Sequence, residues 1–211
     1  MFIALTRWFQ KMRLFCLTIW VLLALAAPAT ALDRDMARQV LAEINLARTA
    51  PRTYAGFLRE FRGLFREKYF VLPGSDIRMQ TNEGVKAVDE AIRLLSRQKP
   101  LPPLIWSDGL AAAADELAKK QEESGAIGHD NIRERIDRHG KWNRQIGENI
   151  GYGPTEARYM VMQLITDDGV PDRGHRKNIF SAVFRTAGAA CGSHPGFGSV
   201  CVMDFADAFR E

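Results

Sequence analysis

The chain has 211 residues, 46% of them hydrophobic and 26% charged, which is enough for one domain with a core and marginal for two. Its formal net charge is +4, but three of the 29 basic residues and none of the 25 acidic residues lie in residues 1–31. The remaining 180 residues carry a net charge of +1, which excludes the strongly basic character typical of nucleic-acid-binding proteins. We therefore expect no nucleic acid among its partners.

Residues 1–31 have the pattern of a secretory signal peptide. A basic start precedes an almost wholly apolar run of 14 residues, 14–27, and the small-residue triplet 29–31 follows it. The apolar run is shorter than the ~18 residues that a bilayer span requires, which favours cleavage after Ala31 over an uncleaved membrane anchor. We expect a secreted or periplasmic protein with no stable membrane span after cleavage. Residues 32–211 would then form a single domain.

Cleavage would leave two cysteines, Cys191 and Cys201, in a compartment that permits disulfides. They flank the turn-rich segment GSHPGFGSV, and the small or apolar runs on either side of it predict a β-hairpin. We expect a disulfide between the two strands of this hairpin. Two free buried thiols are the alternative, and a metal site is disfavoured because the Cys-x-x-Cys spacing is absent.

Apolar residues at helical spacing recur along the chain before this hairpin. They predict helices at 33–46, 51–61, 85–95, 107–124 and 155–166. The clearest of these can begin with Ser107 or Asp108 as its N-cap and can end at Gly125. Residues 62–80 lose clear periodicity and are interpreted as a loop or an insertion. Helices first and paired strands last indicate an α+β fold rather than a parallel nucleotide-binding sheet.

Polar residues beside glycines are the first candidates for chemistry. His129, Glu148 and His175 each lie next to a glycine, in stretches that resemble loops. A histidine at such a place is often reachable by solvent, where its near-neutral pKa is usable. Each of the three is a weak signal when taken alone, because a single histidine in a loop is more often a solvated surface residue. His139 is interpreted as part of a charged surface loop, and His194 as an exposed residue at the hairpin tip.

Five segments taken in order resemble the CAP (SCP-like) superfamily, which includes the plant pathogenesis-related proteins, and one of them, GHRKNIFS, resembles a motif of its bacterial members. These segments are LAEINLARTAP (41–51), LIWSDGLAAAADELA (104–118), GENIGYG (147–153), GHRKNIFS (174–181) and ACG…VCVMDFA (190–206). The resemblance implies a three-layer α-β-α sandwich with a C-terminal β-hairpin. It also implies a central cleft lined by two histidines and two acidic residues.

Carried over position by position, the resemblance puts His129, Glu148 and His175 in that cleft. The family places a glutamate on the helix before the second histidine, and this chain has no glutamate there. Asp167 or Asp168 could substitute for it, or the fourth position could be empty. His129 and His175 could bind Zn²⁺ or another divalent cation, with water and a carboxylate completing the shell. Alternatively, Glu148 could tune a histidine for acid–base chemistry, or simply join two loops.

We therefore expect an exported CAP domain that binds a divalent cation, a lipid or a cell-envelope component without turnover. A metal-assisted hydrolase of peptides or envelope polymers is the first alternative. It would have to use metal-bound water, because G-x-S-x-G and H-E-x-x-H are absent. A structural or adhesive module is the second. The apolar segment 64–72 fits ordinary packing better than the wall of a lipid-accepting groove.

Overall fold

The computed structural model describes residues 29–211 except 75 and 77. The predicted signal peptide therefore lies, apart from its last three residues, outside the described part of the chain. Residues Asp33–Glu211 form one compact unit. None of the helices in the described part combines the length and the apolar character needed to cross a membrane.

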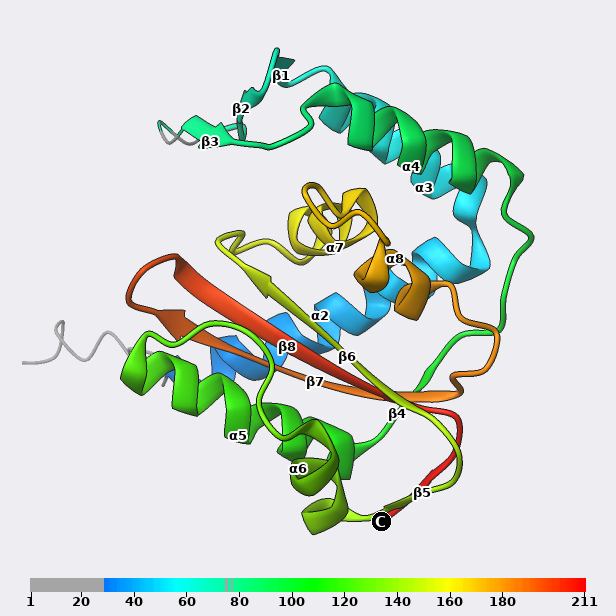
Figure 1. Ribbon diagram of the computed structural model, residues 1–211, viewed down its shortest axis with the longest axis vertical. Helices are drawn as coiled ribbons and strands as arrows, with labels where there is room; N and C mark the ends of the chain where they lie inside the picture. The colour runs from blue at the N-terminus through cyan, green and yellow to red at the C-terminus, as the bar shows by residue number, and fades with distance from the viewer. Residues whose placement is uncertain (1–28, 75, 77) are drawn as a thin grey trace, which may run out of the picture. The chain divides into compact units, whose positions relative to one another are not determined.

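A four-stranded sheet lies at the centre of this unit (Figure 1). The strand order is β4 (Ile105–Trp106), β7 (Thr186–His194), β8 (Gly198–Ala206) and β6 (Ile146–Tyr152). β4 runs parallel to β7, and the other pairs are antiparallel. The predicted hairpin is β7 and β8, and its register puts Cys191 directly opposite Cys201. The two cysteines form the predicted disulfide, which is thereby confirmed.

Helix α5 (Asp108–Ser124) covers one face of the sheet, and the short α6 (Ile132–His139) lies beside it (Figure 1). The hydroxyl of Ser107 caps α5 by accepting a hydrogen bond from the Leu110 N–H, and Gly125 ends it in a left-handed conformation. Gly188 lets α5 approach the sheet, because a Cβ there would lie 2.0 Å from the backbone nitrogen of Ala111. Apolar residues of α5 pack on the strands in a buried cluster of Ala114, Leu117, Ala118, Ile150, Ala190, Val200 and Val202.

The opposite face carries α2 (Ala29–Thr49), α3 (Pro51–Arg62), α4 (Val85–Arg97), α7 (Ala157–Thr166) and α8 (Gly174–Ile179). Their apolar sides share one large core with the strand residues that point away from α5, which are Ala187, Ala189, Cys201, Met203 and Phe205. Figure 1 shows α7 and α8 on the side of the sheet opposite α5 and α6. Helices on both faces of the sheet make the predicted three-layer α-β-α arrangement, and the α+β fold class is confirmed.

Residues 62–80, interpreted as a loop or an insertion, contain a small antiparallel sheet. Its strands are β1 (Phe65–Arg66), β2 (Tyr69–Val71) and β3 (Arg78–Gln80). Strands of two or three residues are too short to show a period of two in the sequence. Aromatic packing holds them to the domain, since the ring of Phe61 on α3 lies 5.2 Å from Phe65 and 5.0 Å from Phe70, measured between centroids.

The stretch around His139 is also more regular than the sequence suggested. Residues 132–139 form α6 rather than a surface loop, and His139 is its last residue. Its Nε2 lies 2.6 Å from the carboxylate of Glu116 on α5. Two further short strands, β5 (Lys141–Trp142) and β9 (Phe209–Arg210), pair with each other after this helix.

Candidate functional site

The site residues gather around β6, which is an edge strand of the sheet. Because side chains alternate along a strand, Glu148 points to the α5 face and Asn149 to the opposite face. The register fixes this assignment, since Glu148 is opposite Asp204 and Asn149 is opposite Met203, whose side chain belongs to the core on the α7 side. The GENIGYG string thus forms most of a strand, and its first two polar side chains point to opposite faces of the sheet.

On the α5 face, Glu148 is the centre of a buried ionic network. One oxygen of its carboxylate lies 2.6 Å from Nδ1 of His129, and the other accepts a hydrogen bond from Nη2 of Arg135. Nη1 of Arg135 lies 3.2 Å from Asp204 and also donates to the carbonyl oxygen of Ala113. Arg135, Glu148 and Asp204 are all nearly inaccessible, whereas the side chain of His129 is 58% exposed. The network therefore holds one exposed imidazole against buried charges.

Two pKa shifts follow from this arrangement. The hydrogen bond to Glu148 raises the pKa of His129, because the carboxylate favours the imidazolium form. Burial, followed by the nearby charge of Glu148, raises the pKa of Asp204 well above its usual range. Within the described part of the chain, one oxygen of Asp204 also has no hydrogen-bond partner. Both shifts reduce the net negative charge that Glu148 and Asp204 would otherwise concentrate beside Arg135.

A ring of hydrogen bonds holds the loop that carries His129. The Gly128 N–H donates to the hydroxyl of Tyr152, and that hydroxyl donates to Oε1 of Gln121, each over 2.9 Å. The side-chain amide of Gln121 returns a bond of 2.7 Å to the carbonyl oxygen of Gly128. Gln121 and Tyr152 thus position the loop that carries His129. The sequence contained no signal for this role of Gln121, and for Tyr152 the only signal was its place in the GENIGYG string.

The interpretation of His194 as an exposed residue at the hairpin tip is wrong. It is 3% exposed, and its Nε2 lies 3.1 Å from the carbonyl oxygen of Ala126, in the loop that carries His129. Its ring packs edge-on against Tyr152 at 5.4 Å between centroids. Because β7 extends to His194 itself, the ring is pinned against the loop between α5 and α6 rather than left at the open turn.

On the opposite face, His175 pairs with Asp167. Asp167 ends α7 in a left-handed conformation, and one of its carboxylate oxygens lies 2.6 Å from Nδ1 of His175. The other oxygen accepts the backbone N–H of Arg176 over 3.2 Å. Asp168 points elsewhere, because its carboxylate accepts the backbone N–H groups of Asn82 and Glu83 just before α4. Of the two aspartates offered by the sequence, Asp167 contacts the histidine and Asp168 does not.

Two asparagines tie α8, which carries His175, to the free edge of β6. Nδ2 of Asn149 donates to the carbonyl oxygen of His175 over 3.0 Å. Nδ2 of Asn178 lies 3.1 Å from the carbonyl oxygen of Glu148 and 2.9 Å from Oδ1 of Asn149. The bond from Asn178 to Glu148 satisfies a backbone carbonyl that an edge strand otherwise leaves open. The two histidine–acid pairs therefore lie next to the same strand, one on each face of the sheet. That both histidines line one cleft stays a prediction.

The donor set around β6 provides two imidazole nitrogens for a metal ion. His129 and His175 each use Nδ1 for a carboxylate, so only Nε2 of each ring is left as a ligand. A carboxylate bound to the second ring nitrogen is the usual outer support of a metal-binding histidine. However, no three His, Cys, Asp or Glu side chains in the described ranges are grouped as a metal-binding set. A metal site formed by the two histidines together therefore stays a prediction, and it would be weak and open rather than a closed structural site.

The raised pKa of His129 gives the first testable prediction. The pair stabilises the folded state at pH values below the ordinary histidine pKa of about 6.5, and this contribution is lost as the pH rises through the folded pKa. In Glu148→Gln we expect the pKa of His129 to fall toward that ordinary value, because a neutral amide no longer favours the imidazolium. NMR titration of the ring measures it, with the exposed Glu123→Gln as the control. An unchanged pKa in Glu148→Gln contradicts the assignment.

Comparison with known families settles the fold family. The model of the CAP family, described as the cysteine-rich secretory protein family, matches residues 41–205. The chain belongs to the CAP family. The resemblance drawn from five sequence segments is thereby confirmed. A comparison with curated proteins gave no match.

Solved structures of bacterial proteins are similar to parts of this CAP chain. One is an extracellular protein containing a SCP domain from Bacillus anthracis strain Ames, at 21% identity and a TM-score of 0.43 over 50% of this chain and 34% of that one. A cysteine-rich secretory protein from Staphylococcus aureus Mu50 has 16% identity and a TM-score of 0.42, over 59% of this chain and 38% of that one. An outer surface protein from Borrelia burgdorferi has 18% identity and a TM-score of 0.43, over 57% of this chain and 86% of that one. The chain thus spans just over a third of the length of the first two.

Proposed function

We propose that this CAP domain acts outside the cytoplasm as a binding module, which recognises a ligand through Nε2 of His129 and of His175 and performs no turnover. The observation that carries the proposal is the shared design of the two pairs. In each pair a buried carboxylate holds Nδ1 of a more exposed imidazole. A ring fixed in this way presents Nε2 in one orientation, which lowers the entropy lost when a ligand binds.

The same contacts argue against catalysis by the acidic residues. Glu148 is bonded to both His129 and Arg135, and Asp167 to both His175 and a backbone N–H. A general base must come within hydrogen-bond reach of the substrate proton. The side chains of Glu148 and Asp167 are only 2% and 1% exposed, so a substrate cannot reach them directly and we assign them the role of orienting the rings.

Two features support a location outside the cytoplasm. The signal-peptide pattern of residues 1–31 predicts export, and the Cys191–Cys201 disulfide is typical of oxidising compartments. A protein that is exported and remains in the envelope, or is released from it, meets divalent cations, lipids and envelope polymers. We propose a component of the cell envelope as the physiological ligand.

Zinc is the sharpest first probe, because two imidazole nitrogens bind it and leave positions for water. We expect the full mature chain to bind Zn²⁺ weakly in calorimetric titration, and the double variant His129→Ala, His175→Ala to lose this binding. His139→Ala is the matched control, since that histidine is bonded to Glu116 away from β6 and its loss should leave zinc binding unchanged. The raised pKa of His129 predicts weaker binding at lower pH, because the proton and the cation compete for one nitrogen.

Hydrolysis assays on peptides and envelope polymers distinguish the alternatives. No turnover by the wild type supports the binding module. Turnover that disappears in the folded double variant overturns it in favour of a metal-assisted hydrolase. Zinc binding equal in the wild type and the double variant shows instead that the pairs only join loops, as expected of a structural or adhesive module.

A further inference from the structure

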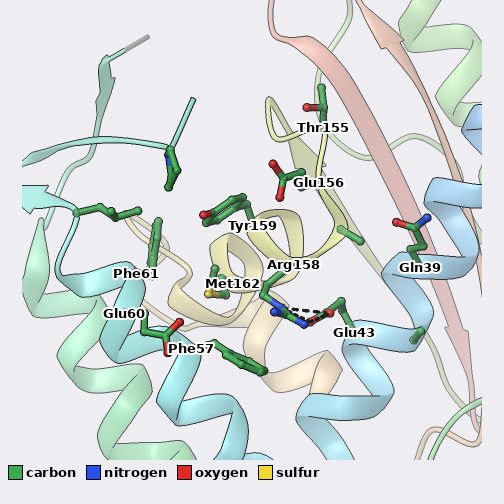
Figure 2. Close-up of a pocket in the computed structure, with 14 residues that line it drawn as sticks. Gln39, Glu43, Phe57, Glu60, Phe61, Thr155, Glu156, Arg158, Tyr159 and Met162 are labelled. Atoms are coloured by element: carbon green, nitrogen blue, oxygen red, sulfur yellow. Dashed lines mark hydrogen bonds and ion pairs between the residues drawn. The ribbon is translucent and has the colours of Figure 1, made fainter. Parts of the chain in front are cut away.

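A hollow lies between α2, α3 and α7 (Figure 2). Its volume of about 600 Å³ is within the range of small-molecule binding sites. None of its lining residues belongs to the two histidine–acid pairs, so it is independent of the proposed function. It is lined by Gln39, Ala42, Glu43, Phe57, Glu60, Phe61, Leu64, Pro73, Thr155, Glu156, Ala157, Arg158, Tyr159 and Met162.

The deepest part of this hollow is apolar and aromatic. Phe61, Ala157 and Met162 are buried, and Leu64 and Tyr159 are half-buried. The rings of Phe61 and Tyr159 lie 6.3 Å apart between centroids, and Figure 2 shows them beside the same space. The segment 64–72 therefore has two roles, since Phe65 packs in the core whereas Leu64 faces the hollow.

The mouth of the hollow is acidic. Three carboxylates, those of Glu43, Glu60 and Glu156, line it together with a single cation, Arg158. Arg158 is already committed, because its guanidinium binds Glu43 at 2.9 Å and lies 4.1 Å above the ring of Phe57 (Figure 2). No hydrogen bond or ion pair joins the side chain of Glu60 or Glu156 to another described residue. At neutral pH these four side chains carry a net charge of −2, although Glu60 also interacts electrostatically with Arg158.

We propose that this hollow binds a small organic cation with an apolar body, of the class of alkyl- or aryl-ammonium compounds. The apolar part would pack on Phe61, Tyr159 and Met162, where it removes apolar surface from water. The cationic group would lie at the mouth beside Glu60 and Glu156, whose carboxylates attract it, with the face of Tyr159 as an additional partner.

The same charges select against an anionic amphiphile. A fatty acid has a suitable apolar chain, but its carboxylate would meet Glu60 and Glu156 at the mouth. Repulsion between like charges makes this arrangement unfavourable, and Arg158, which is held by Glu43, offsets only part of it. Charge at the mouth, rather than the apolar wall, decides which amphiphile binds.

Two probes with the same alkyl chain test this preference on the mature chain. We expect decyltrimethylammonium, used below its micellar concentration, to bind about tenfold more tightly than decanoate in calorimetric titration at low salt. The preference should shrink as salt is added, because the mouth is exposed to solvent. In the double variant Glu60→Gln, Glu156→Gln it should be lost, through weaker binding of the cation and stronger binding of decanoate.

The substitutions at Glu60 and Glu156 should leave the fold intact. Glu60 and Glu156 are exposed, and the side chain of Glu156 makes no capping hydrogen bond to α7. The charge-matched control is Glu123→Gln, Glu134→Gln, on the opposite face of the sheet, and it should keep the wild-type preference. Tyr159→Leu should weaken the binding of decyltrimethylammonium more than the binding of decanoate. Equal or tighter binding of decanoate by the wild type, or an unchanged preference in the Glu60→Gln, Glu156→Gln variant, overturns the proposal.

Discussion

Arg135→Met is expected to lower the free energy of unfolding by about 3–5 kcal/mol at neutral pH. Arg135 is 4% exposed and is bonded to Glu148, Asp204 and two backbone carbonyl oxygens. Methionine preserves much of the apolar stem but leaves two buried carboxylates side by side with no buried cation, since only the exposed ring of His129 remains bonded to Glu148. Denaturant unfolding of the mature chain measures the loss.

The pH dependence of this loss identifies its cause. Burial and the charge of Glu148 already raise the pKa of Asp204, and the loss of Arg135, whose charge lowers it, would raise it further above that of the unfolded chain. The ionised forms then destabilise the folded protein increasingly as the pH rises above the ordinary carboxyl pKa of about 4. The difference between wild type and variant should therefore be smaller at pH 5 than at pH 7.5. Adding Glu148→Gln and Asp204→Asn should restore part of the stability, and Arg133→Met, an exposed change on the same helix, should have little effect.

The long helices and the terminal hairpin were predictable because they carry local signals. Amphipathic periodicity over ten or more residues identified α2 to α5 and α7, and α5 also has a capping serine and a terminal glycine. The hairpin followed from two small or apolar runs around a glycine-rich turn. These elements are encoded mostly by residues close together in the chain.

The strand and helix that build the site lacked such signals. β6 contains two glycines and places Glu148 and Asn149 on its two faces, so it shows no alternation of apolar and polar residues. α6 has the sequence IRERIDRH, in which only Arg135 and Ile136 are buried. Its helical state depends on contacts with α5 and β8 that are distant in sequence, because a charged octapeptide is not a stable helix alone.

The pairs of the site were partly predictable. Resemblance identified His129, Glu148 and His175, but it could not choose between Asp167 and Asp168. That choice depends on the left-handed turn at Asp167, with φ of 57°, which sends the two neighbouring carboxylates in different directions. Arg135 was missed for another reason. Its neighbours are charged, a pattern typical of a solvated face, and only the folded structure shows that this one guanidinium is buried.

Arg48→Met is expected to cost a similar amount, about 3–5 kcal/mol, through a different mechanism. Arg48 lies in the last turn of α2, is fully buried, and donates to the carbonyl oxygens of Pro102, Ile179, Ser181 and Phe184 at 2.6–3.4 Å. Burial lowers its pKa, yet an arginine stays protonated at neutral pH. Methionine would leave these carbonyl groups without a donor.

The same substitution should also increase the mobility of the segment that carries His175. Ile179 ends α8, which carries His175, so loss of the Arg48 bonds loosens the segment that follows this helix. We expect faster amide hydrogen exchange across residues 174–184 in Arg48→Met, at a temperature where the variant remains folded. Arg48→Lys should be intermediate, because one ammonium group cannot reach acceptors on both segments. Arg52→Met, an exposed change three residues after the end of α2, should stay within about 0.5 kcal/mol of wild type. If Arg48→Met matches that control, the four bonds do not hold α8 in place.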